Sequence, residues 1–261
     1  MAFPMPSAGN TVETAGAAAQ FTATHWSLVR AAQQTDSEAA RASLETLCRR
    51  YWYPLYCFLR RSGRDHHDAQ DLVQGFIANL LEDDRHRLRQ ALEPKGKFRT
   101  FLLAALDHFV EDARRREQAA KRGGGATHIS LDEMAAAEGR YANEPATGPT
   151  PQEEFDRRYA CQVIRQALLM LRQEYEAKGK AEIFQTLEPL LTEEVPVGFY
   201  EQAGPRLEMT PAAVKTELSR FRRRFGKLVR CEVAHTVAGA EDLEDEIRYV
   251  FGVWGRVGAG Q

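Results

Sequence analysis

The 261-residue sequence lacks the features that define several large protein classes. Its four cysteines are Cys48, Cys57, Cys161 and Cys231. They lie far apart and form no CxxC pair, which argues against a disulfide framework or a zinc knuckle and favours reduced thiols. No apolar run approaches the roughly 18 residues that a membrane-spanning helix needs. The sequence therefore predicts a cytoplasmic protein without a membrane segment.

The sequence also lacks an overall excess of positive charge. The formal net charge is −2, so any affinity for nucleic acid has to come from local patches. Such patches exist, because residues 211–230 hold seven Lys or Arg against one acid. The opposite sign dominates residues 241–246, where five of six residues are acidic.

Motifs that support common catalytic sites are missing as well. The sequence has no GxSxG, no P-loop and no GxGxxG that opens a βαβ unit. Residues 65–68 read Asp-His-His-Asp, but adjacent residues on a helix point in different directions, so a metal site is not expected. The sequence predicts a protein that is not an enzyme and that has no cofactor and no bound metal.

The apolar pattern predicts an all-α fold. No stretch shows the sustained alternation of a β-strand, whereas apolar residues recur at spacings of three and four. Pro54 is expected to kink or divide the second helix. The expected helices are one from about Thr24, then Ala39–Arg61, Asp65–Leu81, Phe98–Lys121, Gln152–Tyr175, Ala181–Leu191, Tyr200–Leu207, a basic helix after Thr210 and one in the tail after Val237.

Breaks in the helical pattern predict two domains. Residues 1–20 lack the basic start and apolar core of a signal peptide and are expected to form a disordered leader. The first helical domain spans 21–122, a linker rich in Gly and Pro spans 123–151, and the second helical domain spans 152–236. The extension 237–261 carries apolar residues at helical spacing, which predicts a final helix packed on a neighbour.

The basic helix is the most informative element. Thr210 is a suitable N-cap, and Pro211 suits the first helical position. Its apolar residues fall on one face: Val214, Leu218, Phe221, Phe225 and Leu228. A capped helix with one apolar face and a dense cationic surface is typical of a major-groove reader. The plain alternative is a solvated amphipathic helix.

Two further helices have polar faces suited to partners. In 65–81 the expected buried face holds Val73, Phe76, Ile77, Leu80 and Leu81, and the polar face holds Asp68, Asp71, Gln74 and Gly75. An acidic face of this kind suits a basic helical partner, although a solvated face is the alternative. The helix 98–121 interleaves aromatic residues with cations, as melted DNA requires, although its rings also suit a core.

Together these segments resemble the bacterial RNA polymerase sigma factors of the extracytoplasmic-function type. YWYPLYCFLRR, DAQDLVQGF and GKFRTFLLAAL…DARRRE look like sigma region two, and MTPAAVKTELSRFRRRF looks like the helix-turn-helix of region four. The resemblance spans roughly residues 21–237. FTATHWSLV and GKFRTFLLA look especially like a branch of this group with long linkers and C-terminal extensions.

The resemblance implies a set of partners and contacts. The partners would be core RNA polymerase, through its clamp coiled-coil and flap, and promoter DNA, with an anti-sigma protein or a kinase as possible regulators. Polymerase would contact Asp68, Asp71, Leu72 and Gln74. The loop 83–97 would capture a flipped base of the minus-ten element, and melted or duplex minus-ten DNA would contact Lys97, Arg99, His108, Arg115 and Arg116.

The minus-thirty-five element would contact the basic helix. The residues placed for its bases or nearby phosphates are Thr210, Lys215, Thr216, Ser219 and Arg220. Arg222, Arg223 and Arg224 would hold the DNA backbone without reading sequence.

The sequence departs from the family pattern at three positions, and two other readings stay open. Glu208 stands where the helix-turn-helix turn usually has Gly, Pro205 where Ala is usual, and Asp107 at a position commonly basic. A left-handed backbone at Glu208 would cost about 1–2 kcal/mol. The alternatives are a stand-alone helix-turn-helix regulator and a helical adaptor of polymerase. We also expect the helix 241–254 to regulate exposure of one DNA-binding domain.

Overall fold

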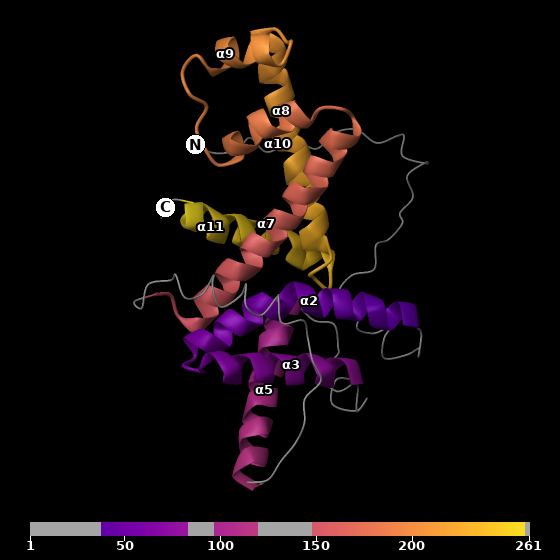
Figure 1. Cartoon of the computed structure of the whole chain (residues 1–261), viewed down its shortest axis with the longest axis vertical. Helices are drawn as coiled ribbons and strands as arrows, with labels where there is room; N and C mark the ends of the chain where they lie inside the picture. The colour runs from indigo at the N-terminus through magenta and orange to yellow at the C-terminus, as the bar shows by residue number, and fades with distance from the viewer. Residues whose placement is uncertain (1–37, 83–96, 120–147, 259–261) are drawn as a thin grey trace.

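The computed structural model describes residues 38–82, 97–119 and 148–258, and helices dominate all three ranges (Figure 1). No strand occurs within these ranges, so the all-α prediction is confirmed. The helix predicted from about Thr24, the loop 83–96 and the linker up to residue 147 lie outside the described residues. The helices are α2 (Glu38–Arg61), α3 (His66–Glu82), α5 (Phe98–Ala119), α7 (Pro151–Ala177), α8 (Ala181–Leu187), the 3-10 helix η1 (Glu188–Leu191), α9 (Phe199–Arg206), α10 (Pro211–Ala234) and α11 (Ala240–Gly258).

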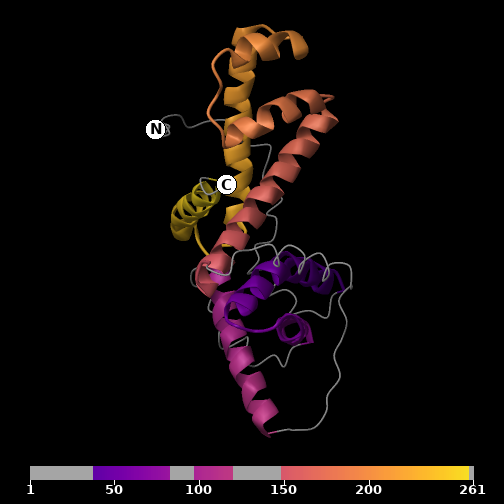
Figure 2. The same cartoon turned by 60° about the vertical axis from the view of Figure 1, so that its left-hand side comes forward.

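Two long helices, α7 and α10, connect the ends of an elongated molecule (Figures 1 and 2). Helices α2, α3 and α5 form one end, while α8, η1 and α9 gather at the other. Helix α11 lies between them and packs on α7 and α10. Helix α2 packs along α7, and one cluster of buried side chains runs through both predicted domains. The division into two domains therefore remains a prediction.

The start of α7 is fixed by a capping box that the helical pattern alone did not locate. Thr150 Oγ1 accepts a hydrogen bond from the Glu153 amide at 3.2 Å, and Glu153 Oε2 accepts one from the Thr150 amide at 2.8 Å. Pro151 occupies the first helical position, where no amide donor is needed. These contacts satisfy donors that a helix end otherwise leaves unpaired.

Helix α2 continues through Pro54 without division. Its side chains Trp52, Leu55 and Tyr56 are buried, so packing on both α3 and α7 holds the helix together despite the lost backbone donor. At the next turn Asp65 Oδ1 accepts from the Asp68 amide at 2.9 Å, which caps α3. The first acid of the Asp-His-His-Asp motif thus has a capping role.

None of the helices within the described ranges combines the length and the apolar content needed to cross a membrane.

Candidate nucleic-acid interface

Helices α9 and α10 form a helix-turn-helix unit at one end of the molecule (Figure 1). The Met209 amide donates to the Gly204 carbonyl at 2.9 Å, which folds the turn back on α9. A Cβ on Gly204 would lie 2.8 Å from the Met209 carbonyl oxygen, so the close approach requires glycine. Thr210 Oγ1 accepts from the Ala213 amide at 3.2 Å, which confirms the predicted N-cap.

The turn carries the strain expected at Glu208. Glu208 has a φ of 53°, in the left-handed region, and it is the one non-glycine residue with positive φ in the described ranges. Pro205 lies in the last turn of α9. Because α9 ends at Arg206, the backbone donor that Pro205 lacks is missing only near the end of the helix, and the helix is hardly shortened.

We expect the substitution Glu208→Gly to stabilise the protein. Glycine adopts the left-handed backbone without the Cβ clash, but it also gains freedom in the unfolded chain, so the net gain is about 0.5–1 kcal/mol. Urea denaturation followed by circular dichroism measures this change. Glu208→Gln keeps the Cβ and removes the charge, so it should leave stability unchanged. An equal gain in both variants would show that charge, and not backbone strain, sets the effect.

The apolar face of α10 is buried as the periodicity predicted. All five apolar residues of the predicted face are buried: Val214, Leu218, Phe221, Phe225 and Leu228. The Phe221 ring lies 5.2 Å from the Tyr175 ring and 5.7 Å from the Phe184 ring, between centroids. These edge-on contacts fix α10 against α7 and α8.

The predicted minus-thirty-five residues lie at the N-cap of α10 and on its exposed surface. All the predicted residues are exposed: Thr210, Lys215, Thr216, Ser219, Arg220, Arg222 and Arg223. Arg220 lies 3.8 Å from Glu217, while Arg223 has no ion-pair partner among the described residues. These two arginines therefore present charge to solvent.

Two other arginines of α10 turn back onto the protein. Arg222 donates to the Leu190 carbonyl through Nη2 at 2.7 Å and Nε at 3.2 Å. Arg224 Nε donates to Glu174 Oε2 at 2.8 Å, and this hydrogen bond lowers the pKa of Glu174. Each of these arginines joins α10 to a neighbouring helix but stays exposed, so their contact with the DNA backbone remains a prediction.

Sequence reasoning missed two lysines that extend the cationic face. Lys178 and Lys180 belong to the turn between α7 and α8, far from α10 in the sequence. With α10 they line an open hollow whose cations are Lys178, Lys180, Arg220, Arg223, Arg224 and Lys227. No spacing in the sequence signals this proximity, because it arises from the packing of α7 on α10.

The polar face of α3 is narrower than predicted. Asp68 and Asp71 are exposed and Leu72 is half-buried. Gln74, however, is buried, so the prediction that it shares the exposed face is wrong. Helix α3 packs on both α2 and α5, and this buries a wider arc of the helix than a single neighbour would.

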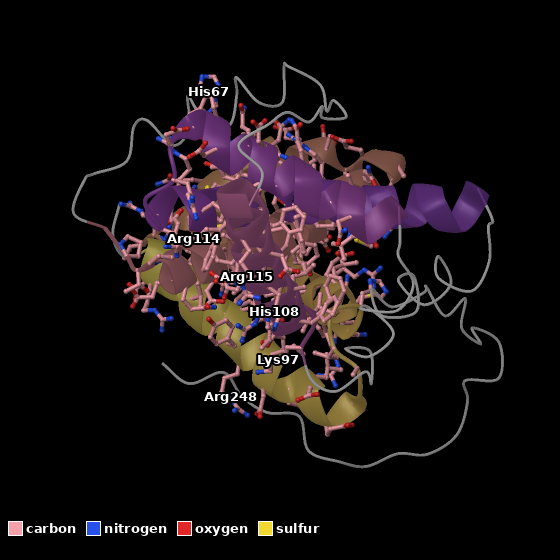
Figure 3. The ribbon with its side chains drawn as sticks, turned by 90° about the horizontal axis from the view of Figure 1, so that it is seen from below. His67, Lys97, His108, Arg114, Arg115 and Arg248 are labelled. Carbon is pink, nitrogen blue, oxygen red and sulfur yellow. The ribbon has the colours of Figure 1, made fainter. Side chains whose placement is uncertain are left out.

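Helix α5 exposes part of the predicted minus-ten surface (Figure 3). His108 and Arg115 are exposed, and Arg115 pairs with Glu111 at 3.5 Å on the same helix. The side chain of Arg116 lies outside the described residues. Asp107 is exposed beside His108, and its partial burial raises the pKa of its carboxyl group.

Lys97 and Arg99 are engaged by acids from two other helices. Arg99 is buried, donates through Nε to Glu246 Oε1 at 2.8 Å and through Nη1 to Asp156 Oδ1 at 3.0 Å. Lys97 Nζ lies 3.2 Å from Glu246 Oε2. Burial by itself lowers the pKa of Arg99, but the hydrogen bond and charge of Glu246, with the charge of Asp156, raise it above its ordinary value. Arg99, which the resemblance places on DNA, is thus inaccessible in this conformation.

The structure therefore places the cationic face of α9 and α10 at one end of the molecule, and the acidic α3 face and the partly covered α5 surface at the other. Comparisons with known protein families, with curated proteins and with solved structures find no match to this chain.

Proposed function

We propose that this protein is a sigma factor of the extracytoplasmic-function type, which binds core RNA polymerase, recognises promoter DNA and promotes strand opening. The observation that carries the proposal is the α9–α10 unit. An N-capped helix, held by its apolar face, presents Lys215, Ser219, Arg220 and Arg223 to solvent. This arrangement suits entry into the major groove of duplex DNA.

The other end of the molecule supports the same proposal. Asp68 and Asp71 lie exposed on α3, where they suit a basic helical partner such as the polymerase clamp. His108 and Arg115 on α5 suit contact with minus-ten DNA. The near-neutral net charge fits a protein that binds DNA strongly only with polymerase.

Run-off transcription with core polymerase on a pool of genomic fragments tests the proposal. The protein should direct specific transcripts, and Asp68→Lys with Asp71→Lys should abolish them, because the acidic face is lost without loss of core packing. The matched control is Glu193→Lys with Glu194→Lys, an equal charge reversal at exposed residues far from α3 along the chain. Transcripts that survive the α3 variant would place the polymerase contact elsewhere.

A stand-alone helix-turn-helix regulator is the second candidate, favoured by the core that runs from α2 into α7. This candidate predicts a dimer that binds a palindromic site tightly without polymerase. A monomer in light scattering, together with specific transcripts, would reject it. A helical adaptor of polymerase is a third reading, which differs in needing no cationic face on α10.

A further inference from the structure

A fully buried carboxylate on α11 pairs with Arg99 of α5 and with Lys97, the residue before α5. Glu246 has 0 % exposure, and both of its oxygens are used. Oε1 accepts from Arg99 Nε at 2.8 Å, while Oε2 accepts from Arg99 Nη2 at 3.4 Å and lies 3.2 Å from Lys97 Nζ. A forked contact of this kind is the one a guanidinium makes with a carboxylate or with a phosphate.

The rest of the site closes around Arg99. Asp156 of α7 accepts from Arg99 at 3.0 Å, and the guanidinium carbon lies 4.0 Å from the centroid of the Tyr249 ring on α11. Two helices that are distant from α5 in the sequence, α7 and α11, thus converge on one of its arginines. We call Lys97, Arg99, Asp156 and Glu246 the α5–α11 ion cluster.

The backbone beside the cluster is also held. The Phe98 amide donates to the Thr236 carbonyl at 2.8 Å, and Lys97 and Val237 form an antiparallel bridge. The segment between α10 and α11 therefore lies against the first turn of α5. Release of α5 has to break this backbone contact together with the ion cluster.

Helix α11 is anchored independently of the cluster. Val250 and Val253 are buried, and the Trp254 ring lies 6.0 Å from the Phe225 ring of α10, between centroids. On the surface, Glu244 pairs with Arg230 of α10. Because these contacts do not involve α5, α11 can hold Glu246 in place as a fixed competitor for the α5 cations.

We infer that α11 is an intramolecular competitor of DNA, in which Glu246 occupies the position of a phosphate on Lys97 and Arg99. The inference rests on the proposed function, since that function places DNA on α5. While the cluster is closed, the start of α5 does not bind DNA. Displacement of α5 from α11 exposes both cations at once.

The cluster sets the apparent affinity through the fraction of open molecules. The apparent Kd of DNA equals its intrinsic Kd divided by that fraction. If the cluster is closed in roughly nine molecules of ten, its release strengthens binding about tenfold. Opening also changes Phe98 amide protection, which hydrogen exchange reports without any DNA.

The test uses the full chain and a fluorescently labelled single-stranded oligonucleotide of mixed sequence. Glu246→Gln should lower its Kd about tenfold and speed hydrogen exchange at the start of α5. Glu246→Gln with Arg99→Gln should remove the gain, because Arg99 is one of the released cations. The matched control is Glu244→Gln, which removes an exposed acid from the same helix and should leave both measurements unchanged.

If Glu246→Gln does not fold, hydrogen exchange on the unaltered protein tests the competition between DNA and Glu246. Saturating DNA should speed hydrogen exchange at the Phe98 amide, which donates to the Thr236 carbonyl only while α5 lies against the segment 235–239, because DNA and Glu246 exclude each other. Equal DNA affinity in the two proteins, or Phe98 amide protection that DNA does not change, would overturn the competition but leave DNA binding intact. Exchange that speeds in Glu246→Gln while neither protein binds DNA, alone or with core polymerase, would instead overturn the proposed function, and the competition with it.

Discussion

Charge reversal of Arg220 and Arg223 together abolishes promoter-specific transcription, if the proposed function is correct. Both side chains are exposed on α10, and the one ion pair that either makes within the described residues is the 3.8 Å contact of Arg220 with Glu217. Each arginine that loses a base or phosphate contact costs about 1–3 kcal/mol, so duplex binding by the polymerase complex should weaken on the order of 100-fold. Binding should also depend less steeply on salt, because fewer counterions are released.

Transcription and filter binding over a salt series measure these effects, and the control isolates them from net charge. Arg165→Glu with Arg172→Glu makes the same charge change at exposed positions on α7, and it should leave transcription unchanged. Circular dichroism should show normal folding in both double variants. Intact transcription from the Arg220 and Arg223 variant would support an adaptor that does not read promoters.

The location of this surface could be predicted from the sequence, because the spacing of apolar residues along a helix shows which face is buried. The spacing of Val214, Leu218 and Phe221 defines a buried face, so the cations between them have to face outward or sideways. Thr210 and Pro211 fix the start of the helix through local contacts alone. Features that depend on neighbours within about four residues were therefore accessible.

The partner of each cation could not be predicted in the same way. Arg222 and Arg223 are adjacent and chemically identical, yet Arg222 binds the Leu190 carbonyl and Arg223 faces solvent. The difference comes from η1, whose position depends on how α7, α8, α9 and α10 pack at that end of the molecule. Sequence spacing carries no information on which of two neighbouring arginines meets a distant carbonyl group.

Distant packing also explains why two residues of α3 and α5 that were predicted to lie on partner surfaces are buried. Gln74 is buried because α3 has two neighbours, and Arg99 is buried because α11 and α7 bring two acids to it. The acidic run 241–246 was visible in the sequence, but its contact with α5 was not, because Arg99 and Glu246 are 147 residues apart along the chain. Only tertiary packing reveals that one acid of this run is buried while most of the others remain accessible.

Truncation of Phe221 should lower the free energy of unfolding more than any other substitution proposed for the end of the molecule that holds α8, α9 and α10. Phe221 is fully buried between Tyr175 and Phe184, and Phe221→Ala leaves a cavity on which three helices converge. Such a change costs about 3–5 kcal/mol, which is a large part of the stability of a typical domain. Urea denaturation followed by circular dichroism measures the loss.

The half-buried Phe199 provides the matched control, since Phe199→Ala removes an equal ring from the start of α9 and should cost far less. Equal losses at the two positions would show that the ring cluster does not hold α10. Phe221 stands between Arg220 and Arg223 in the sequence, so the two predictions divide one helix by face. The charge reversal of Arg220 and Arg223 should remove DNA binding and leave the stability unchanged. Phe221→Ala should instead lower the stability, and it should weaken DNA binding only to the extent that α10 unfolds.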